Sequence, residues 1–271
     1  MIRNFYSIDY QVHSFRSHDG KASIAEQCSK AVELGLDEIG FTEHKDFDPF
    51  DPEVNYFEYD RYMQEIEEAR SAWKGKLIIR AGVEIDYQIW FEDKIAEYLQ
   101  NHSFDFVLGS VHYVNRKMIM TPEYNKTHNQ VSAYQSYFLE VLHSVQSGLF
   151  DVLSHLEYAN RRGIAAWGPY SPEPHRDVLT AIFQELISRD MAFEINTAGL
   201  HQNLGVMYPV EQTVQIYASL GGRKITIGSD AHHPDQLAWQ FADAAQTALR
   251  CGISSLATYQ NRICIMKPLK A

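Results

Sequence analysis

Short runs of apolar, often β-branched residues recur along the chain, and most of them end in a histidine or a carboxylate. The run from Lys224 to Gly228 is typical of a buried strand and leads directly into Ser229-Asp230-Ala231-His232. Because side chains two positions apart leave a strand on the same face, Asp230 and His232 are expected to point to one place beyond the strand end. Runs of the same kind predict further strands at 8–13, 37–41, 77–83, 105–109, 150–154 and 191–195.

Helical patterns fill the segments between these strands. Ser23 and Glu26 have the spacing of a capping box, which predicts a helix that continues through Leu34 and ends at Gly35. Apolar residues at three- and four-residue steps predict another helix that ends near Gly148, with its stripe at Val131, Tyr134, Phe138, Val141 and Val145. The remaining helices are expected at 58–74, 90–100, 175–189, 209–220 and 236–250, and residues 255–271 are expected to form a short tail.

This alternation of strands and helices predicts a parallel sheet with helical crossovers. Seven such units, with no linker or low-complexity segment between them, favour one α/β barrel domain that spans residues 1–271. The active sites of such barrels lie at the carboxyl ends of the strands, where the histidines and carboxylates of this chain also fall. An open, doubly wound sheet is the alternative, and it accounts less well for polar residues at the ends of six different strands.

The composition narrows the function classes. The formal net charge of −11 argues against a nucleic-acid partner, because such a protein is expected to have a basic surface. No apolar run approaches the roughly 20 residues of a membrane span, and the first residues lack the apolar core of a secretory signal. The 3 cysteines are widely spaced and odd in number, so no disulfide framework is expected and a cytoplasmic location is the default.

Imidazole and carboxylate side chains at the strand ends indicate a metal site. Neutral imidazoles combined with carboxylates suit Zn, Mn or Fe, and the absence of cysteine from these positions excludes a thiolate-bound structural zinc. The set contains more donors than the roughly four to six that one ion needs, so more than one ion is expected. Two ions bridged by a carboxylate and a hydroxide are an arrangement that hydrolyses phosphate esters. The candidate positions are His13, His44, Glu84, His112, His155, Asp230 and His232.

Several motifs resemble those of the polymerase-and-histidinol-phosphatase (PHP) family. They are Asp9-x-Gln11-x-His13, Thr42-Glu43-His44, Gly82-Val83-Glu84, the separate His112 and His155, and Ser229-Asp230-Ala231-His232, and they occur in order over nearly the whole chain. The resemblance implies a distorted (β/α)7 barrel, similar to a TIM barrel, with a trinuclear metal site. The segment from Glu194 to Leu200, together with the last strand, resembles the histidinol-phosphate phosphatase branch in particular.

The resemblance also implies which residues hold the ions. Glu84 would bridge the first two ions, and the family spacing favours Asp19 over its neighbour His18 for the third. The first ion would be held by Gln11, His13, Glu84 and Asp230, the second by Glu84, His112 and His155, and the third by Asp19, His44 and His232. A hydroxide bridging the first two ions would attack phosphorus, so Glu84, Asp230 and His232 are expected to be catalytic.

Two positions depart from the family pattern. Gln11 stands where the family has histidine, and because an amide is the weaker ligand, Gln11 is a weak ligand, a donor to a ligand, or a spectator. His201 stands where the phosphatase branch has an arginine that binds phosphate. Arg161 and Arg162 either take over that role, since arginine offers two parallel donors, or form an ordinary solvated pair. Asn196 either contacts the substrate or shapes a turn.

The sequence therefore predicts a metal-dependent phosphomonoesterase with a small phosphorylated substrate, and the resemblance favours L-histidinol phosphate. A phosphodiesterase or exonuclease is the first alternative, since members associated with polymerases cut nucleic acid, and a degenerate regulatory or metal-storage barrel is the second. Glu43 is expected to orient a neighbouring histidine. The number and identity of the ions and the oligomeric state stay open. Surface positions are expected for His102, His128, His143 and His175.

Overall fold

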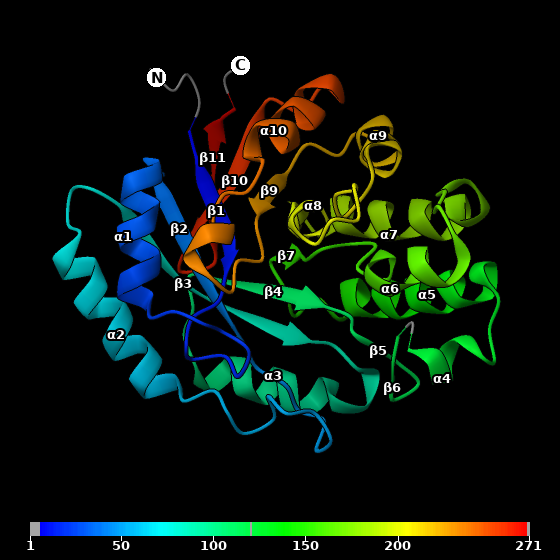
Figure 1. Ribbon diagram of the computed structural model, residues 1–271, viewed down its shortest axis with the longest axis horizontal. Coiled ribbons are helices and arrows are strands. Elements are labelled where there is room, and N and C mark those ends of the chain that lie inside the picture. Colours follow the sequence, from blue (N-terminus) through cyan, green and yellow to red (C-terminus); the bar gives the residue numbers. More distant parts are fainter. Residues whose placement is uncertain (1–5, 120, 270–271) are drawn as a thin grey trace.

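The computed structural model describes residues 6–119 and 121–269, and its main element is a sheet of seven parallel strands (Figure 1). Each strand pairs in parallel with the sheet strand that follows it in the chain. The strands are β1 (Ile8–Val12), β2 (Glu38–His44), β3 (Ile78–Asp86), β4 (Phe106–Ser110), β7 (Val152–Leu153), β8 (Ala192–Asn196) and β9 (Ile225–Gly228).

The first and last strands meet and nearly close the sheet into a barrel. Val12 forms a parallel bridge with Ala231, just beyond the end of β9. The His13 amide donates to the Ala231 carbonyl at 2.9 Å, and the Ala231 amide is 3.3 Å from the Gln11 carbonyl. This closure excludes the open, doubly wound sheet and confirms the predicted (β/α)7 barrel.

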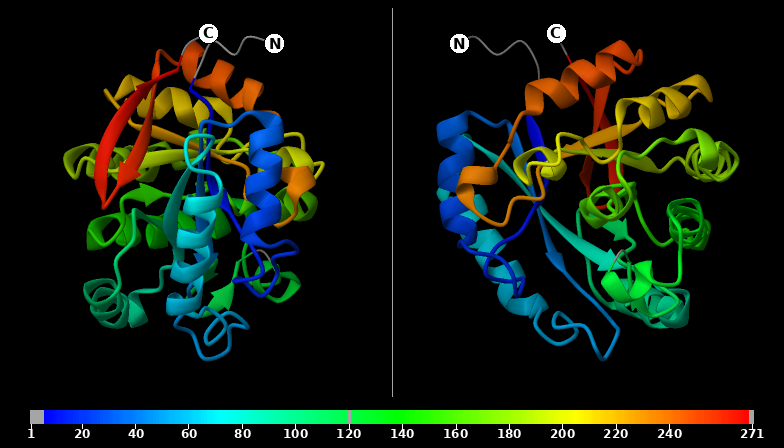
Figure 2. Two further views of the ribbon diagram at one scale, coloured as in Figure 1. Left: turned by 90° about the vertical axis from the view of Figure 1, so that its left-hand side faces the viewer. Right: turned by 45° about the vertical axis from the view of Figure 1, so that its right-hand side comes forward.

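Helices lie outside the strands, as both views in Figure 2 show. None of those within the described residues combines the length and the apolar character that crossing a membrane requires. They are α1 (Ile24–Leu34), α2 (Tyr59–Ala72), α3 (Glu92–Asn101), α4 (Pro122–Asn125), α5 (Gln130–Ser147), α6 (Asn160–Trp167), α7 (Arg176–Ser188), α8 (Ala198–His201), α9 (Glu211–Ser219) and α10 (Phe241–Arg250). Single 3-10 turns lie at Ile89–Phe91, Glu173–His175 and Pro234–Gln236.

Local sequence signals set several helix ends. Ser23 and Glu26 form the expected capping box before α1, and Gly35 ends that helix in the left-handed conformation. In α5 the predicted apolar stripe is buried except for Val131, which is 51% exposed in the first turn. The prediction of a surface position for His175 is wrong, because this side chain is only 3% exposed and packs among the rings of Tyr134, Phe138 and Tyr170.

Residues 255–268 form a β-hairpin rather than the expected tail, and residues 270–271 lie outside the described residues. The hairpin consists of β10 (Ser255–Gln260) and β11 (Ile263–Pro268), which pair antiparallel. Its turn residues Asn261 and Arg262 have φ angles of 51° and 62°, the left-handed conformation that a two-residue hairpin turn requires. The sequence did not predict this turn because it lacks the glycine that usually marks one. A second small pair, β5 (Tyr113–Val114) with β6 (Lys117–Met118), follows β4.

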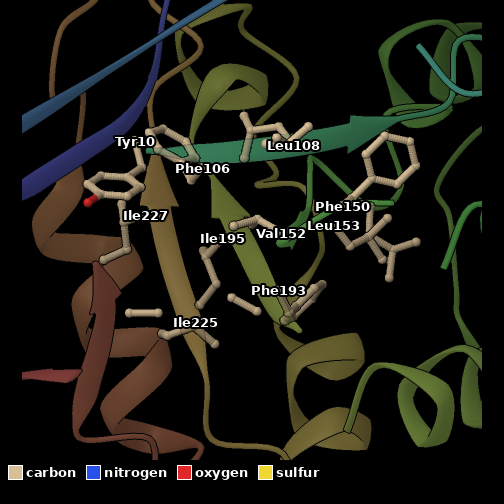
Figure 3. Packing of buried hydrophobic residues seen from close by; sticks show 14 of the residues in the cluster. Tyr10, Phe106, Leu108, Phe150, Val152, Leu153, Phe193, Ile195, Ile225 and Ile227 are labelled. Carbon is tan, nitrogen blue, oxygen red and sulfur yellow. The ribbon is translucent and has the colours of Figure 1, made fainter. Parts of the chain in front are cut away.

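Aromatic side chains fill the amino end of the barrel. The rings of Tyr10 and Phe106 stack with their centroids 4.5 Å apart (Figure 3). The ring of Tyr259, in the hairpin, packs against Phe106 with the two centroids 6.2 Å apart. Phe106 occupies space that only a glycine leaves free, since a Cβ on Gly82 would lie 2.6 Å from the Phe106 ring. The hairpin thus completes the core where the strands begin.

A β-bulge in β1 changes where its side chains point. The register with β2 shifts between Asp9 and Val12, so the alternation of faces is interrupted. Gln11 and His13 both approach Glu84, whereas Asp9 accepts hydrogen bonds from Ser229. Asp9 therefore does not reach the place beside Glu84 where the side chains of Gln11 and His13 lie.

Candidate metal centre

Polar side chains from the carboxyl ends of the strands meet around Glu84, which is 1% exposed. One carboxylate oxygen, Oε1, lies 2.9 Å from His155 Nε2 and 3.9 Å from His112 Nε2. The other oxygen, Oε2, lies 3.4 Å from His13 Nε2 and 3.6 Å from His44 Nδ1. Each oxygen of Glu84 therefore faces its own pair of imidazoles.

The potential ligands fall into three overlapping groups whose nitrogen and oxygen atoms lie within 4.8 Å of one another. Glu84 belongs to two of these groups and His13 also belongs to two, so the groups form one continuous cluster. The groups are Glu84 with His112 and His155, Glu84 with His13 and Asp230, and His13 with His44 and His232.

The structure distinguishes the two neighbouring candidates for the third ion. Asp19 Oδ2 lies 3.0 Å from His232 Nε2, and Asp19 Oδ1 lies 3.8 Å from His44 Nε2. His18 instead donates its backbone N–H to Glu53, and its ring meets the edge of Tyr56. Asp19 is thus the one that approaches both imidazoles.

Gln11 lies beneath the cluster and contacts Glu84 through its amide nitrogen. Nε2 donates to Glu84 Oε2 at 2.7 Å, while Oε1 accepts from Asn196 Nδ2 at 2.7 Å and lies 3.3 Å from Ser154 Oγ. With its oxygen engaged on the side away from Glu84, Gln11 acts here as a donor to the central carboxylate.

A network of hydroxyl groups orients the histidines. Glu43 is buried and accepts from Ser14 Oγ and from Ser17 Oγ, and the Ser17 hydroxyl lies 3.3 Å from His13 Nδ1. Ser17 also accepts the backbone N–H of His44 at 3.0 Å. Glu43 therefore acts on His13 through Ser17, a residue that no sequence motif indicated.

The loop after β9 holds Asp230 in an unusual backbone conformation, with a φ of 56°. Asp9 fixes this loop by accepting from the Ser229 N–H at 2.9 Å and from the Ser229 hydroxyl at 2.6 Å. Left-handed conformations of residues other than glycine cost free energy and persist where the surroundings enforce them. Asp9 thus positions a carboxylate of the cluster without joining it.

Electrostatics keep two members of the cluster, Glu84 and His112, in the protonation states that bind metal. Although burial favours protonation, His44 and His13 hold the pKa of Glu84 well below its ordinary value, so it is ionised. Burial and the neighbouring His155 lower the pKa of His112 to about 3. His112 is therefore neutral at physiological pH, the form in which an imidazole binds a metal ion.

The donor set fits divalent cations. His13 Nε2 is fully buried, lies 3.2 Å from Asp230 Oδ1, and has no hydrogen-bond partner among the described residues. A buried, unpartnered nitrogen between carboxylates is a position that a cation would satisfy. The nitrogen and oxygen donors suit borderline ions such as zinc, and the carboxylates offer oxygen ligands.

A cavity of about 220 Å³ opens onto the cluster. Arg161 and Arg162 line it, whereas the other two candidate substrate-binding residues do not. His201 Nε2 lies 3.1 Å from the Ser229 carbonyl, and Asn196 is buried in the barrel interior against Gln11. The structure therefore brings the arginines to the cavity and leaves His201 and Asn196 outside its lining.

The fold is a near-closed parallel α/β barrel with a cluster of histidines and carboxylates at the strand ends. This combination is typical of barrel proteins that bind metal ions at that end. The chain belongs to the PHP domain family, whose signature matches residues 9–198. A histidinol-phosphatase from Lactococcus lactis is 29% identical over 268 residues, covering 93% of this chain and 94% of that protein. A probable histidinol-phosphatase from Thermotoga maritima is 29% identical over 230 residues, which cover 85% of this chain and 86% of that protein.

Solved structures give the same picture. The chain superimposes with a TM-score of 0.87 on the Lactococcus lactis histidinol phosphate phosphatase in complex with zinc, L-histidinol and phosphate. The two share 27% identity, and the match covers 96% of this chain and 99% of the other. A protein from Listeria monocytogenes, at 21% identity and a TM-score of 0.74, shares the fold.

Proposed function

We propose that the chain is a metal-dependent phosphomonoesterase that hydrolyses L-histidinol phosphate to L-histidinol and phosphate. The observation that carries this proposal is the cluster around Glu84, which offers overlapping donor groups at the base of a cavity. The similarity to histidinol-phosphatases extends over nearly the full length of both chains, which supports the same substrate. A small phosphorylated substrate fits the cavity volume of about 220 Å³.

The proposal includes two or three divalent ions, with Zn, Mn and Fe as the candidates. Such ions would stabilise charge on the phosphoryl oxygens and lower the pKa of bound water. Glu84 is proposed to serve two ions, because its oxygens face different imidazole pairs. Asp230 and His232 line the cavity and are proposed to complete the catalytic set. The proposed ligands are His13, Asp19, His44, Glu84, His112, His155, Asp230 and His232, with Gln11 as a donor to Glu84.

Arg161 is proposed as the arginine that binds the phosphate. Its Nη1 lies 2.5 Å from the Tyr158 hydroxyl, which holds the guanidinium beside the cavity. The Tyr158 ring in turn packs 4.6 Å from the His112 ring, next to the cluster. Arg162 Nη1 instead contacts Met118 Sδ at 3.2 Å, so this guanidinium is not held by a residue that packs against the histidine cluster. The 3 free cysteines are compatible with the cytoplasmic location that we also propose.

Metal removal tests the proposal directly. Exhaustive chelation is expected to abolish hydrolysis of L-histidinol phosphate, and addition of Zn, Mn or Fe is expected to restore it. Elemental analysis of the same samples gives the number of ions per chain. Full activity in metal-free protein would refute the proposal, faster cleavage of phosphodiesters would favour the exonuclease alternative, and metal binding without hydrolysis would favour the regulatory barrel.

A further inference from the structure

The cavity above the metal centre is lined by arginines in one part and by carboxyl groups in another. Arg161 and Arg162, at the start of α6, line one part of it. Asp46, Asp51 and Glu53, from the connection between β2 and α2, line another. These three carboxylates, here called the acidic wall, are only 6%, 8% and 6% exposed.

No lysine or arginine within the described residues forms an ion pair with the acidic wall. Asp51 accepts from the Tyr113 hydroxyl at 2.7 Å and from the Glu53 amide at 2.8 Å, and both of these donors are neutral. Glu53 accepts the backbone N–H of His18, at 3.1 and 3.0 Å, and no other donor in the part of the chain that the structure describes. The nearby Lys45 is directed elsewhere, with its ammonium 3.3 Å from the Val54 carbonyl.

The residues behind the acidic wall also contain more acceptors than donors. The Gln88 amide nitrogen donates to Asp48 at 3.3 Å and to Asp86 at 3.2 Å. Its oxygen, on a side chain that is 4% exposed, has no hydrogen-bond partner among the described residues. Burying a carboxylate without a cationic partner costs free energy, so a cationic ligand that paired with Asp51 and Glu53 would relieve that cost.

We propose that the acidic wall binds a cationic group on the alcohol portion of the substrate, with Asp51 and Glu53 as specificity-determining residues. This inference rests on the proposed function, because a phosphate at the metal centre leaves the alcohol to extend into the cavity. L-Histidinol phosphate carries a primary amine on that alcohol. Its ammonium offers three donors, and hydrogen bonds between an ammonium and a carboxylate are stronger than those between neutral groups.

The arrangement selects substrates by the sign of charge at each end. A phosphomonoester with an ammonium group satisfies both the arginine side and the acidic wall. An ester with a neutral alcohol leaves the buried carboxylates unpaired, and an ester with an anionic alcohol is repelled. The metal centre itself discriminates poorly among phosphomonoesters, since it contacts the group they share, so the acidic wall accounts for preference among them.

The test compares L-histidinol phosphate with its deaminated analogue, 3-(imidazol-4-yl)propyl phosphate. The wild-type protein is expected to prefer the aminated ester in kcat/KM, and Glu53→Gln and Asp51→Asn are each expected to reduce that preference by about 10- to 100-fold. Glu58→Gln is the matched control, because Glu58 lies on the same connection but is exposed and paired with Arg16 and Arg61. This control is expected to retain the wild-type preference.

A wild-type protein without preference, or variants that lower kcat/KM equally for both esters, would overturn the inference. If Asp51→Asn does not fold, Glu53→Gln tests the inference alone. If the wild-type protein does not hydrolyse L-histidinol phosphate, the proposed function fails by itself, and the acidic wall is then tested with O-phosphoethanolamine against ethyl phosphate. A preference for the aminated member of that pair, lost in Glu53→Gln, supports the acidic wall, and its absence refutes it.

Discussion

Two buried glutamates on adjacent strands illustrate how the ends of the barrel differ. Glu38, at the amino end of β2, is fully buried, and its Oε1 accepts from Arg80 Nε at 2.6 Å and from the Tyr10 hydroxyl at 2.5 Å. Glu84, toward the carboxyl end of β3, is as deeply buried but faces imidazoles and the Gln11 amide instead. Glu38 is therefore paired with a permanently charged arginine, whereas Glu84 has no such partner among the described residues that surround it.

The comparison separates a structural charge from a functional one. Arg80 and Tyr10 both donate hydrogen bonds to Glu38, so the charge of this carboxylate is balanced within the chain and needs no metal ion. Around Glu84 the neighbours are weak bases that can give up protons, which leaves room for a metal ion to supply the positive charge. Functional sites often retain such locally unfavourable groups while the rest of the fold supplies stability.

The largest effect is expected from Glu84→Gln. An amide in place of the carboxylate cannot bridge two cations, so metal content should fall by more than one equivalent. The value of kcat/KM should fall by three orders of magnitude or more, on the order of 4 kcal/mol of transition-state stabilisation. Elemental analysis and steady-state kinetics measure both, and loss of a single ion with activity retained would contradict the bridging role.

Glu38→Gln makes the same chemical change at the other end of the barrel. It leaves Arg80 partly buried without its carboxylate, so the free energy of unfolding should fall by about 3 kcal/mol. Metal content per folded chain should not change. Chemical denaturation and elemental analysis test this, and a specific loss of metal in this variant would show that the two ends are not independent.

The smallest effect is expected at Gln11, which lies between the two ends. Gln11→Leu removes the donor to Glu84 and should weaken metal affinity by about 10- to 100-fold, the usual range for residues that support a ligand. Gln11→His should strengthen it, because an imidazole at this position can bind an ion directly. Competition titrations with a chelator measure both shifts, and identical affinities in the two variants would show that Gln11 is a spectator.

Much of the barrel could be predicted from the sequence because each strand repeats one local pattern. An apolar run followed by a histidine or carboxylate determines both the strand and the position of its polar side chain. Because the strands are parallel, their carboxyl ends and the polar side chains that follow them lie at the same end of the barrel. This is why His112 and His155, far apart in the sequence, could be assigned to one site that the structure also brings together, with ring centroids 5.2 Å apart.

Other features depend on contacts that have no local signal. The bulge that separates Asp9 from Gln11 arises from pairing with β2, which a single strand does not reveal. Ser17 supports two histidines through its hydroxyl, yet it lies outside every motif. The acidic wall has no regular spacing, and its importance appears only once the loop after β2 is seen beside the cavity.

The closure of the barrel has a consequence for the behaviour of the whole chain. Its first and last strands are joined by few backbone bonds, yet His13 and Asp230 stand on opposite sides of that seam with Nε2 and Oδ1 only 3.2 Å apart. An ion shared by these two residues would link the beginning of the domain to its end. Binding and closure would then be thermodynamically coupled, since a ligand that binds only the closed form stabilises it. Amide hydrogen exchange along β1 and β9 would consequently report metal loading.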